Sequence, residues 1–115
     1  MNLKRKTLLS SKATEDKKGF DLVILDLKEY SSITDYFMIC SGNSTKHVQA
    51  IADGINEALK KEGVRPLGIE GYNEARWVLM DYDDLVIHIF DEETRNFYDL
   101  ERLWGNAPRV NPEKN

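Results

Sequence analysis

The chain has 115 residues, of which 41% are hydrophobic and 31% are charged, and this composition is typical of one folded globular domain. A net charge of −4 argues against general nucleic-acid binding, because an acidic surface repels phosphates. The single cysteine excludes an intrachain disulfide, and no apolar run reaches the roughly 20 residues that span a bilayer. We therefore expect a cytoplasmic protein that binds no membrane, with one domain over residues 1–108 and a flexible tail over 109–115.

The first elements are a basic helix and two buried strands. Residues 1–18 hold six bases and two acids, which indicates a solvated surface or a secondary contact with RNA. The same segment predicts a weakly amphipathic helix over 3–18, with Leu8, Leu9 and Ala13 as its apolar anchors. The segments 20–27 and 36–41 are apolar on both faces, as expected for strands inside a sheet.

The second half of the chain begins with the clearest helix, over residues 44–62. Segment 64–70 is an edge strand because Pro66 cannot donate a ladder hydrogen bond, and strands 76–80 and 85–90 form a hairpin around an acidic turn. Short helical turns follow over 92–104. The apolar residues of the 44–62 helix recur with its period and predict the buried side: Val48, Ile51, Ala52, Ile55 and Leu59.

The order of these elements predicts an α/β fold. The strand–helix–strand unit over 36–70 calls for a right-handed crossover and a parallel strand pair, whereas the later hairpin is antiparallel. We therefore expect a single domain with a mixed sheet of about five strands and helices mainly on one face.

Catalytic chemistry finds little support in the sequence. The 41–45 turn precedes a helix and could hold a phosphate, but it lacks both glycine-rich phosphate motifs, and the strand that follows the helix lacks the paired carboxylates of a nucleotidyltransferase. Four aspartates around the hairpin (81, 83, 84 and 91) form a solvated rim rather than an EF-hand. Cys40, His47 and His88 form no recognisable nucleophile–base set. We expect no enzyme activity, no metal and no cofactor, with a nucleotide-binding transferase as the alternative.

Residues 70–101 are the segment in which we expect the function. They contain ten acids and two bases, interleaved with aromatic residues. Acidic side chains steer a basic partner, and aromatic side chains supply the buried anchors of an interface. The segment therefore predicts docking onto a basic protein surface.

Several sequence runs, in this order and spacing, resemble the Iojap-like ribosomal silencing factor family. They are LDL at 25–27, TDYFMICSG at 34–42, HVQAIA at 47–52, EG at 70–71, WVLMDY at 77–82, HIF at 88–90 and RNFYDLERLW at 95–104. Lys46 and His47 stand where the family has an arginine–glutamine pair.

The resemblance implies a nucleotidyltransferase-like fold without catalytic carboxylates. It also implies binding to the large ribosomal subunit through ribosomal protein L fourteen, a block on the joining of the small subunit, and reduced translation when nutrients are short. A role in large-subunit assembly is implied as well.

The resemblance and strand alternation together predict the partner-binding residues. An exposed apolar sheet face could also serve a homodimer off the ribosome, or a generic dimeric scaffold. The expected patch comprises Trp77, Met80, Asp81, His88 and Phe90, with Glu70, Gly71 and Tyr98 at its edge.

Overall fold

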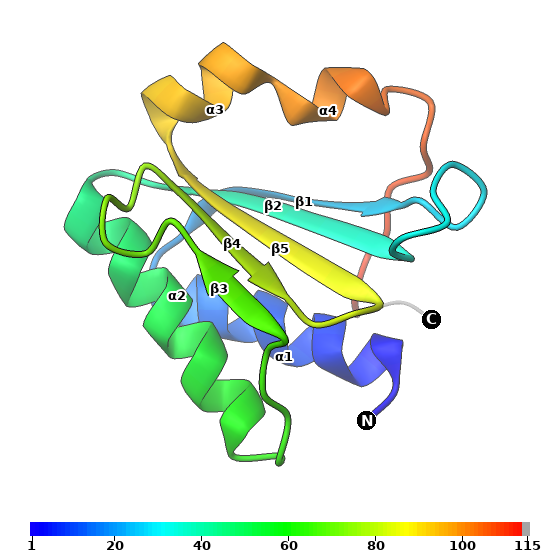
Figure 1. The fold of residues 1–115 in the computed structure, drawn as a ribbon, viewed down its shortest axis with the longest axis horizontal. Coiled ribbons are helices and arrows are strands. Elements are labelled where there is room, and N and C mark those ends of the chain that lie inside the picture. Colours follow the sequence, from blue (N-terminus) through cyan, green and yellow to red (C-terminus); the bar gives the residue numbers. More distant parts are fainter. Residues whose placement is uncertain (114–115) are drawn as a thin grey trace.

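The computed structural model describes residues 1–113, which form one α/β domain (Figure 1). The expected flexible tail over 109–115 therefore falls partly on residues 114–115, which lie outside the described residues. The helices and strands follow in chain order: α1 (Leu3–Asp16), β1 (Phe20–Asp26), β2 (Tyr36–Gly42), α2 (Thr45–Lys60), β3 (Gly68–Glu70), β4 (Trp77–Asp81), β5 (Leu85–Asp91), α3 (Glu92–Tyr98) and α4 (Leu100–Leu103).

The five strands form one mixed sheet in the order β1-β2-β5-β4-β3. β2 and β5 are parallel, and the other neighbouring strands are antiparallel. The expected parallel pair between segments 36–41 and 64–70 was wrong, because β3 pairs with β4 at the sheet edge. The seven-residue β5 is apolar enough to be buried beside β2, whereas the three residues of β3 are all exposed.

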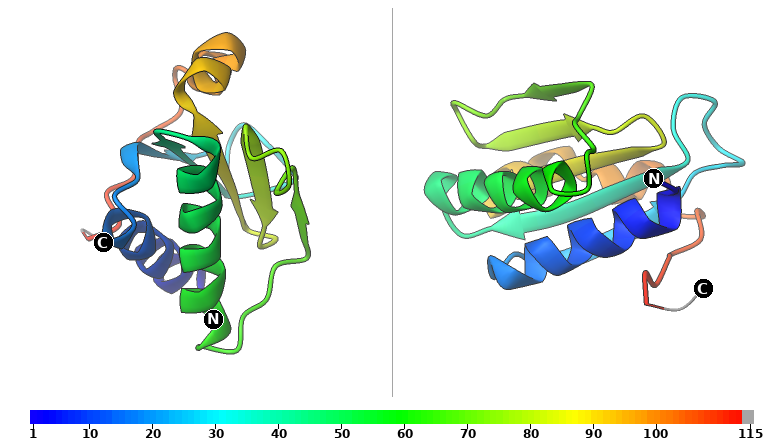
Figure 2. Two further views of the ribbon diagram at one scale, coloured as in Figure 1. Left: turned by 90° about the vertical axis from the view of Figure 1, so that its left-hand side faces the viewer. Right: turned by 90° about the horizontal axis from the view of Figure 1, so that it is seen from below.

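Helices lie on both faces of the sheet. α1 and α2 run side by side along one face, called the inner face here, while the short α3 and α4 lie over the opposite, outer face (Figures 1 and 2). All five predicted apolar residues of α2 are buried against the inner face, which confirms the helical periodicity. Cys40 also lies there, fully buried, and burial raises its pKa to about 12.

α1 packs through the predicted Ala13 and through small polar side chains, while the predicted Leu9 packs against the core only at its edge. Leu8 and Leu9 are only partly buried, whereas Ser10, Ser11 and Thr14 are buried. The hydroxyls of Ser11 and Thr14 donate to carbonyls one turn earlier, at 2.8 and 2.9 Å, which satisfies them away from water. Small side chains also let the helix approach the sheet closely.

The segment after α4 returns to the sheet. The amide of Asp26 donates to the carbonyl of Pro108 at 2.8 Å, and the amide of Val110 donates to the carbonyl of Ile24 at 2.9 Å. Arg109 forms a bridge with Leu25. Residues 109–110 are therefore paired with β1, unlike the flexible tail that we expected there.

Candidate functional site

Strand alternation in β4 places two sets of side chains on opposite faces. Trp77 and Leu79 point to the outer face and are partly buried, whereas Val78 and Met80 are fully buried on the inner face. Trp77 therefore stays a predicted contact, but Met80 cannot reach a partner because it packs beneath α2. Its inclusion in the predicted patch was wrong.

An aromatic cluster covers the outer face around Trp77. The indole stacks on Phe90 with ring centroids 5.0 Å apart, and the ring of Tyr98 from α3 lies 4.8 Å away. Phe37 continues the cluster across the sheet, with its ring centroid 4.5 Å from His88 and 5.0 Å from Trp104. The indole of Trp77 thus contacts the rings of Phe90, Tyr98 and His88.

His88 and Phe90 lie beneath Trp77 rather than at the surface. Phe90 is fully buried and His88 is 3% exposed, so both predicted contacts are corrected to supporting residues. The indole Nε1 of Trp77 donates to Nδ1 of His88 at 3.0 Å. Burial lowers the pKa of His88 to about 4, so the ring is neutral near pH 7 and Nδ1 remains an acceptor.

The outer face is only partly covered. Leu100, Ala107 and Trp104 pack over the β1–β2 side of the sheet, and Figure 1 shows α3 and α4 above that side. Leu79 on β4 lies opposite the exposed Glu70 of β3 in the strand register. The surface formed by the uncovered side chains of β3 and β4 and the neighbouring exposed side chains of α3 is called the docking surface here. It comprises Trp77, Leu79, Glu70, Phe97 and Tyr98.

Two members of this surface, Phe97 and Leu79, were not predicted from the sequence. Phe97 is 80% exposed at the end of α3, and a helix this short gives no periodicity from which its orientation could be predicted. Leu79 shares its strand face with Trp77, so alternation alone could have identified it. Tyr98, which was predicted, is 49% exposed and contacts Trp77.

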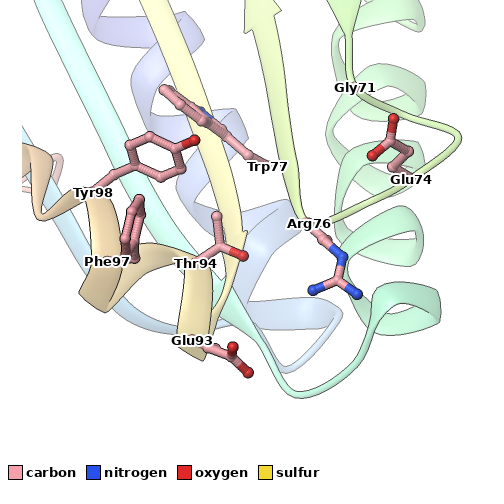
Figure 3. A pocket seen from close by; sticks show the side chains of 8 residues that line it. All are labelled: Gly71, Glu74, Arg76, Trp77, Glu93, Thr94, Phe97 and Tyr98. Carbon is pink, nitrogen blue, oxygen red and sulfur yellow. The ribbon is translucent and has the colours of Figure 1, made fainter.

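A pocket of about 420 Å³ opens between α3 and the loop before β4 (Figure 3). The glycine predicted at the edge of the patch has a structural role here. Gly71 has φ +79°, and a Cβ at this position would lie 2.2 Å from the carbonyl oxygen of Trp77. The loop can therefore approach β4 only with glycine there. The residues that line the pocket are Gly71, Glu74, Arg76, Trp77, Glu93, Thr94, Phe97 and Tyr98.

Most of the acidic residues of segment 70–101 fall into two separate groups. The 81–84 turn joins one end of β4 to β5, where Asp81 accepts from the amide of Asp83 and Asp84 pairs with Lys6 at 2.8 Å. The acids at positions 74 and 91–93 lie at the opposite end of the hairpin. Asp81 is therefore separated from Trp77 by the length of β4, about 13 Å.

The turn after β2, considered for phosphate binding, uses its polar groups within the chain. The amide of Asn43 donates to Nδ1 of His47 at 2.9 Å, and the Ser44 hydroxyl caps α2. The Ser41 hydroxyl accepts from the buried Arg95, which also pairs with Glu101 at 3.0 Å. Within residues 1–113 no three His, Cys, Asp or Glu side chains are grouped to hold a metal ion.

No helix among residues 1–113 is long and apolar enough to cross a membrane.

The family model described as "Ribosomal silencing factor during starvation" matches residues 2–115. The chain belongs to this family. Its sequence is 44% identical over 108 residues to the ribosomal silencing factor RsfS of Bacillus subtilis, covering 94% of this chain and 92% of that protein.

A solved structure and a more distant relative extend the comparison. The crystal structure of a protein from Chromobacterium violaceum superposes with a TM-score of 0.89 at 33% identity, covering 99% of this chain and 98% of that one. The mouse protein named "Mitochondrial assembly of ribosomal large subunit protein 1" is 34% identical over 87 residues, which cover 73% of this chain and 38% of that protein. The silencing-factor fold thus extends over almost the whole chain.

Proposed function

We propose that this chain binds the large ribosomal subunit in the cytoplasm through ribosomal protein L fourteen and sterically blocks joining of the small subunit. Translation then falls when nutrients are limiting. Steric exclusion needs affinity and bulk but no catalytic residue, so under this proposal the chain is not an enzyme. Membership of the silencing-factor family supports this proposal.

The observation that carries the proposal is the docking surface. Trp77 and Tyr98 form a supported aromatic patch beside the uncovered Leu79, with Glu70 at its border. Ribosomal proteins are basic, so an aromatic patch with an acidic border complements them. One interface of standard size with a few aromatic anchors can reach nanomolar affinity.

Co-sedimentation with purified ribosomal particles tests the proposal. The chain should pellet with free large subunits and should remain in the supernatant with ribosomes that are already joined. Trp77→Ala should abolish pelleting, whereas Glu15→Ala, on the exposed side of α1, should leave it unchanged. Equal binding to joined ribosomes would exclude the anti-association mechanism while retaining a ribosomal partner.

Charge steering gives a second test of the same proposal. The association rate should fall as salt rises, with a smaller change in dissociation, because screening acts on the encounter. Asp81→Lys should slow association without unfolding the chain, since the Asp81 side chain is only partly buried at the end of β4. An association rate independent of salt would show that the acids serve only solubility.

A role in large-subunit assembly is the second candidate function. The mouse relative is named for assembly of the large ribosomal subunit, and this similarity supports the candidate. Depletion of the chain should then cause immature large-subunit particles to accumulate under rich growth conditions. Silencing alone predicts normal particles in rich medium and a defect only during starvation.

The enzyme and dimer alternatives each have a direct test. Calorimetry with ATP or CTP and magnesium should give no saturable heat, because the groups of the 41–45 turn are occupied within the chain. Analytical ultracentrifugation in the absence of ribosomes would detect a homodimer. If the dimer uses the docking surface, Trp77→Ala should dissociate it as well.

A further inference from the structure

We propose that the pocket between the 71–76 loop and α3 receives the side chain of a lysine or arginine from the partner protein. The inference rests on the proposed docking function and assigns a ligand chemistry to one site within the docking surface. Three observations carry it: the aromatic wall of the pocket, its excess of carboxylates, and the way the chain holds its loop in place.

Aromatic rings form one wall of the pocket. Figure 3 shows Trp77, Phe97 and Tyr98 together on one side. The rings of Trp77 and Tyr98 lie 4.8 Å apart, and Phe97 meets Tyr98 edge-on at 5.0 Å. Electron-rich ring faces attract ammonium and guanidinium groups, and the long alkyl stem of either side chain suits an apolar wall.

Carboxylates border the same pocket. Glu74 lies across from the aromatic wall on the loop, and Glu93 lies on α3 (Figure 3). Arg76 is the one base among the lining residues, and within residues 1–113 it forms no ion pair. Its lining residues therefore carry a net negative charge, with two carboxylates against one guanidinium. A cationic side chain fits this field, whereas an acidic one is repelled.

The chain holds the loop wall in a fixed conformation. The hydroxyl of Tyr72 donates to Asp53 on α2 at 2.9 Å, and Gln49 donates to the carbonyl of Tyr72 at 2.9 Å. The amide of Ala75 donates to the carbonyl of Gly71 at 2.9 Å, and Ala75 is fully buried with φ +57°. A preformed wall reduces the entropy that is lost on binding.

Titration with small amides tests the chemistry of the pocket in the full chain. The probes are N-acetyl-lysine amide and its uncharged counterpart N-acetyl-norleucine amide, followed by the indole ¹H–¹⁵N resonances. Trp77 reports on the pocket, and Trp104 is an internal reference because it packs at the other side of the outer face. The lysine probe should shift the Trp77 resonance saturably, and the norleucine probe should not.

Charge variants of the pocket give opposite predicted effects. Glu74→Gln combined with Glu93→Gln should lower the affinity of the chain for the lysine probe and for the large subunit about threefold to tenfold. Arg76→Gln should strengthen both, because it removes the resident competing charge. The matched control is Glu57→Gln, an exposed change on α2 that should have no effect.

The outcomes separate the pocket from the docking function. Equal shifts with lysine and norleucine, or no shift, would overturn the cationic ligand. Weaker binding in Arg76→Gln would indicate an acidic ligand and would also overturn it. If the wild-type chain pellets with large subunits and the double glutamine variant pellets equally well, only the pocket assignment fails. If the wild-type chain does not pellet at all, the docking function fails.

Discussion

The hydrogen bond between Trp77 and His88 should hold the indole in its docking orientation. Its N···N distance is 3.0 Å, and His88 is buried. Nε2 of His88 has no partner within residues 1–113, so replacing His88 also removes a buried unpaired group. A single substitution of His88 therefore combines the loss of this hydrogen bond with the stabilising removal of an unpaired buried nitrogen. A double-mutant cycle is needed to isolate the energy of the bond.

The cycle uses His88→Phe, Trp77→Phe and the double variant. His88→Phe keeps an aromatic ring against Phe37 but removes the hydrogen-bond acceptor. Trp77→Phe keeps a ring against Phe90 but removes the donor. A neutral hydrogen bond contributes about 0.5–1.5 kcal/mol, so the coupling free energy of unfolding should be about 1 kcal/mol. In urea this corresponds to a non-additive midpoint shift of roughly 0.3–1 M.

Subunit binding by the same variants tests the orienting role. In the Trp77 background, His88→Phe should reduce affinity, because the indole loses its fixed direction. In the Trp77→Phe background the same change should have no further effect, since no indole N–H remains. Free energies that add within about 0.5 kcal/mol in the stability cycle would refute the bond as an energetic link. Equal binding losses in both backgrounds would show that His88 acts only through packing.

Three further predictions follow from local geometry. Gly71→Ala should destabilise the chain in urea more than Gly63→Ala does. At both positions φ is positive, and an alanine in that conformation costs about 1–2 kcal/mol. Only at Gly71 does the new Cβ also clash with the carbonyl of Trp77. Equal losses would contradict the close approach. Native Cys40 should be alkylated only as fast as the chain unfolds, because burial raises its pKa to about 12; rapid labelling would contradict this. Because burial lowers the pKa of His88 from 6.5 to about 4, only the unfolded chain binds this proton between those values. The contribution of His88 to the free energy of unfolding is therefore fully present above about pH 6.5, and it falls by about 3 kcal/mol toward pH 4. Thermal unfolding should show less acid destabilisation in His88→Phe, and identical pH profiles would contradict the shift.

The sequence by itself determined the local elements and the family. The apolar period of 44–62 identified α2 and all its buried residues, because a helix of four turns repeats the pattern often enough to be unambiguous. The strands β1, β2 and β5 followed from their apolar runs, and β2 and β5 are buried inside the sheet as expected. The expected inside position of β1 was wrong, because β1 lies at the sheet edge, where β2 is the only one of the described strands that pairs with it, and it buries only Ile24 and Leu25. The family followed from seven short motifs in a fixed order over nearly the whole chain.

Strand pairing required the tertiary structure. The 64–70 segment follows α2 in sequence, which suggested pairing with β2, but β5 takes that place. Burying a continuous apolar strand such as β5 at the centre of the sheet removes more apolar surface from water than burying the short β3 would. β5 and β3 compete for the place beside β2 although they lie far from it in sequence.

Only the tertiary structure decided which side chains of the predicted patch reach solvent. Alternation separates Trp77 from Met80 but does not say which of the two faces α1 and α2 cover. His88 was expected in the patch from the family motif and strand alternation, yet it is buried, and the indole of Trp77 satisfies its Nδ1. Likewise, one acidic stretch in the sequence becomes two groups in space. The two strands of the β4–β5 hairpin are antiparallel, so its turn lies at one end of the strands and its open end lies at the other.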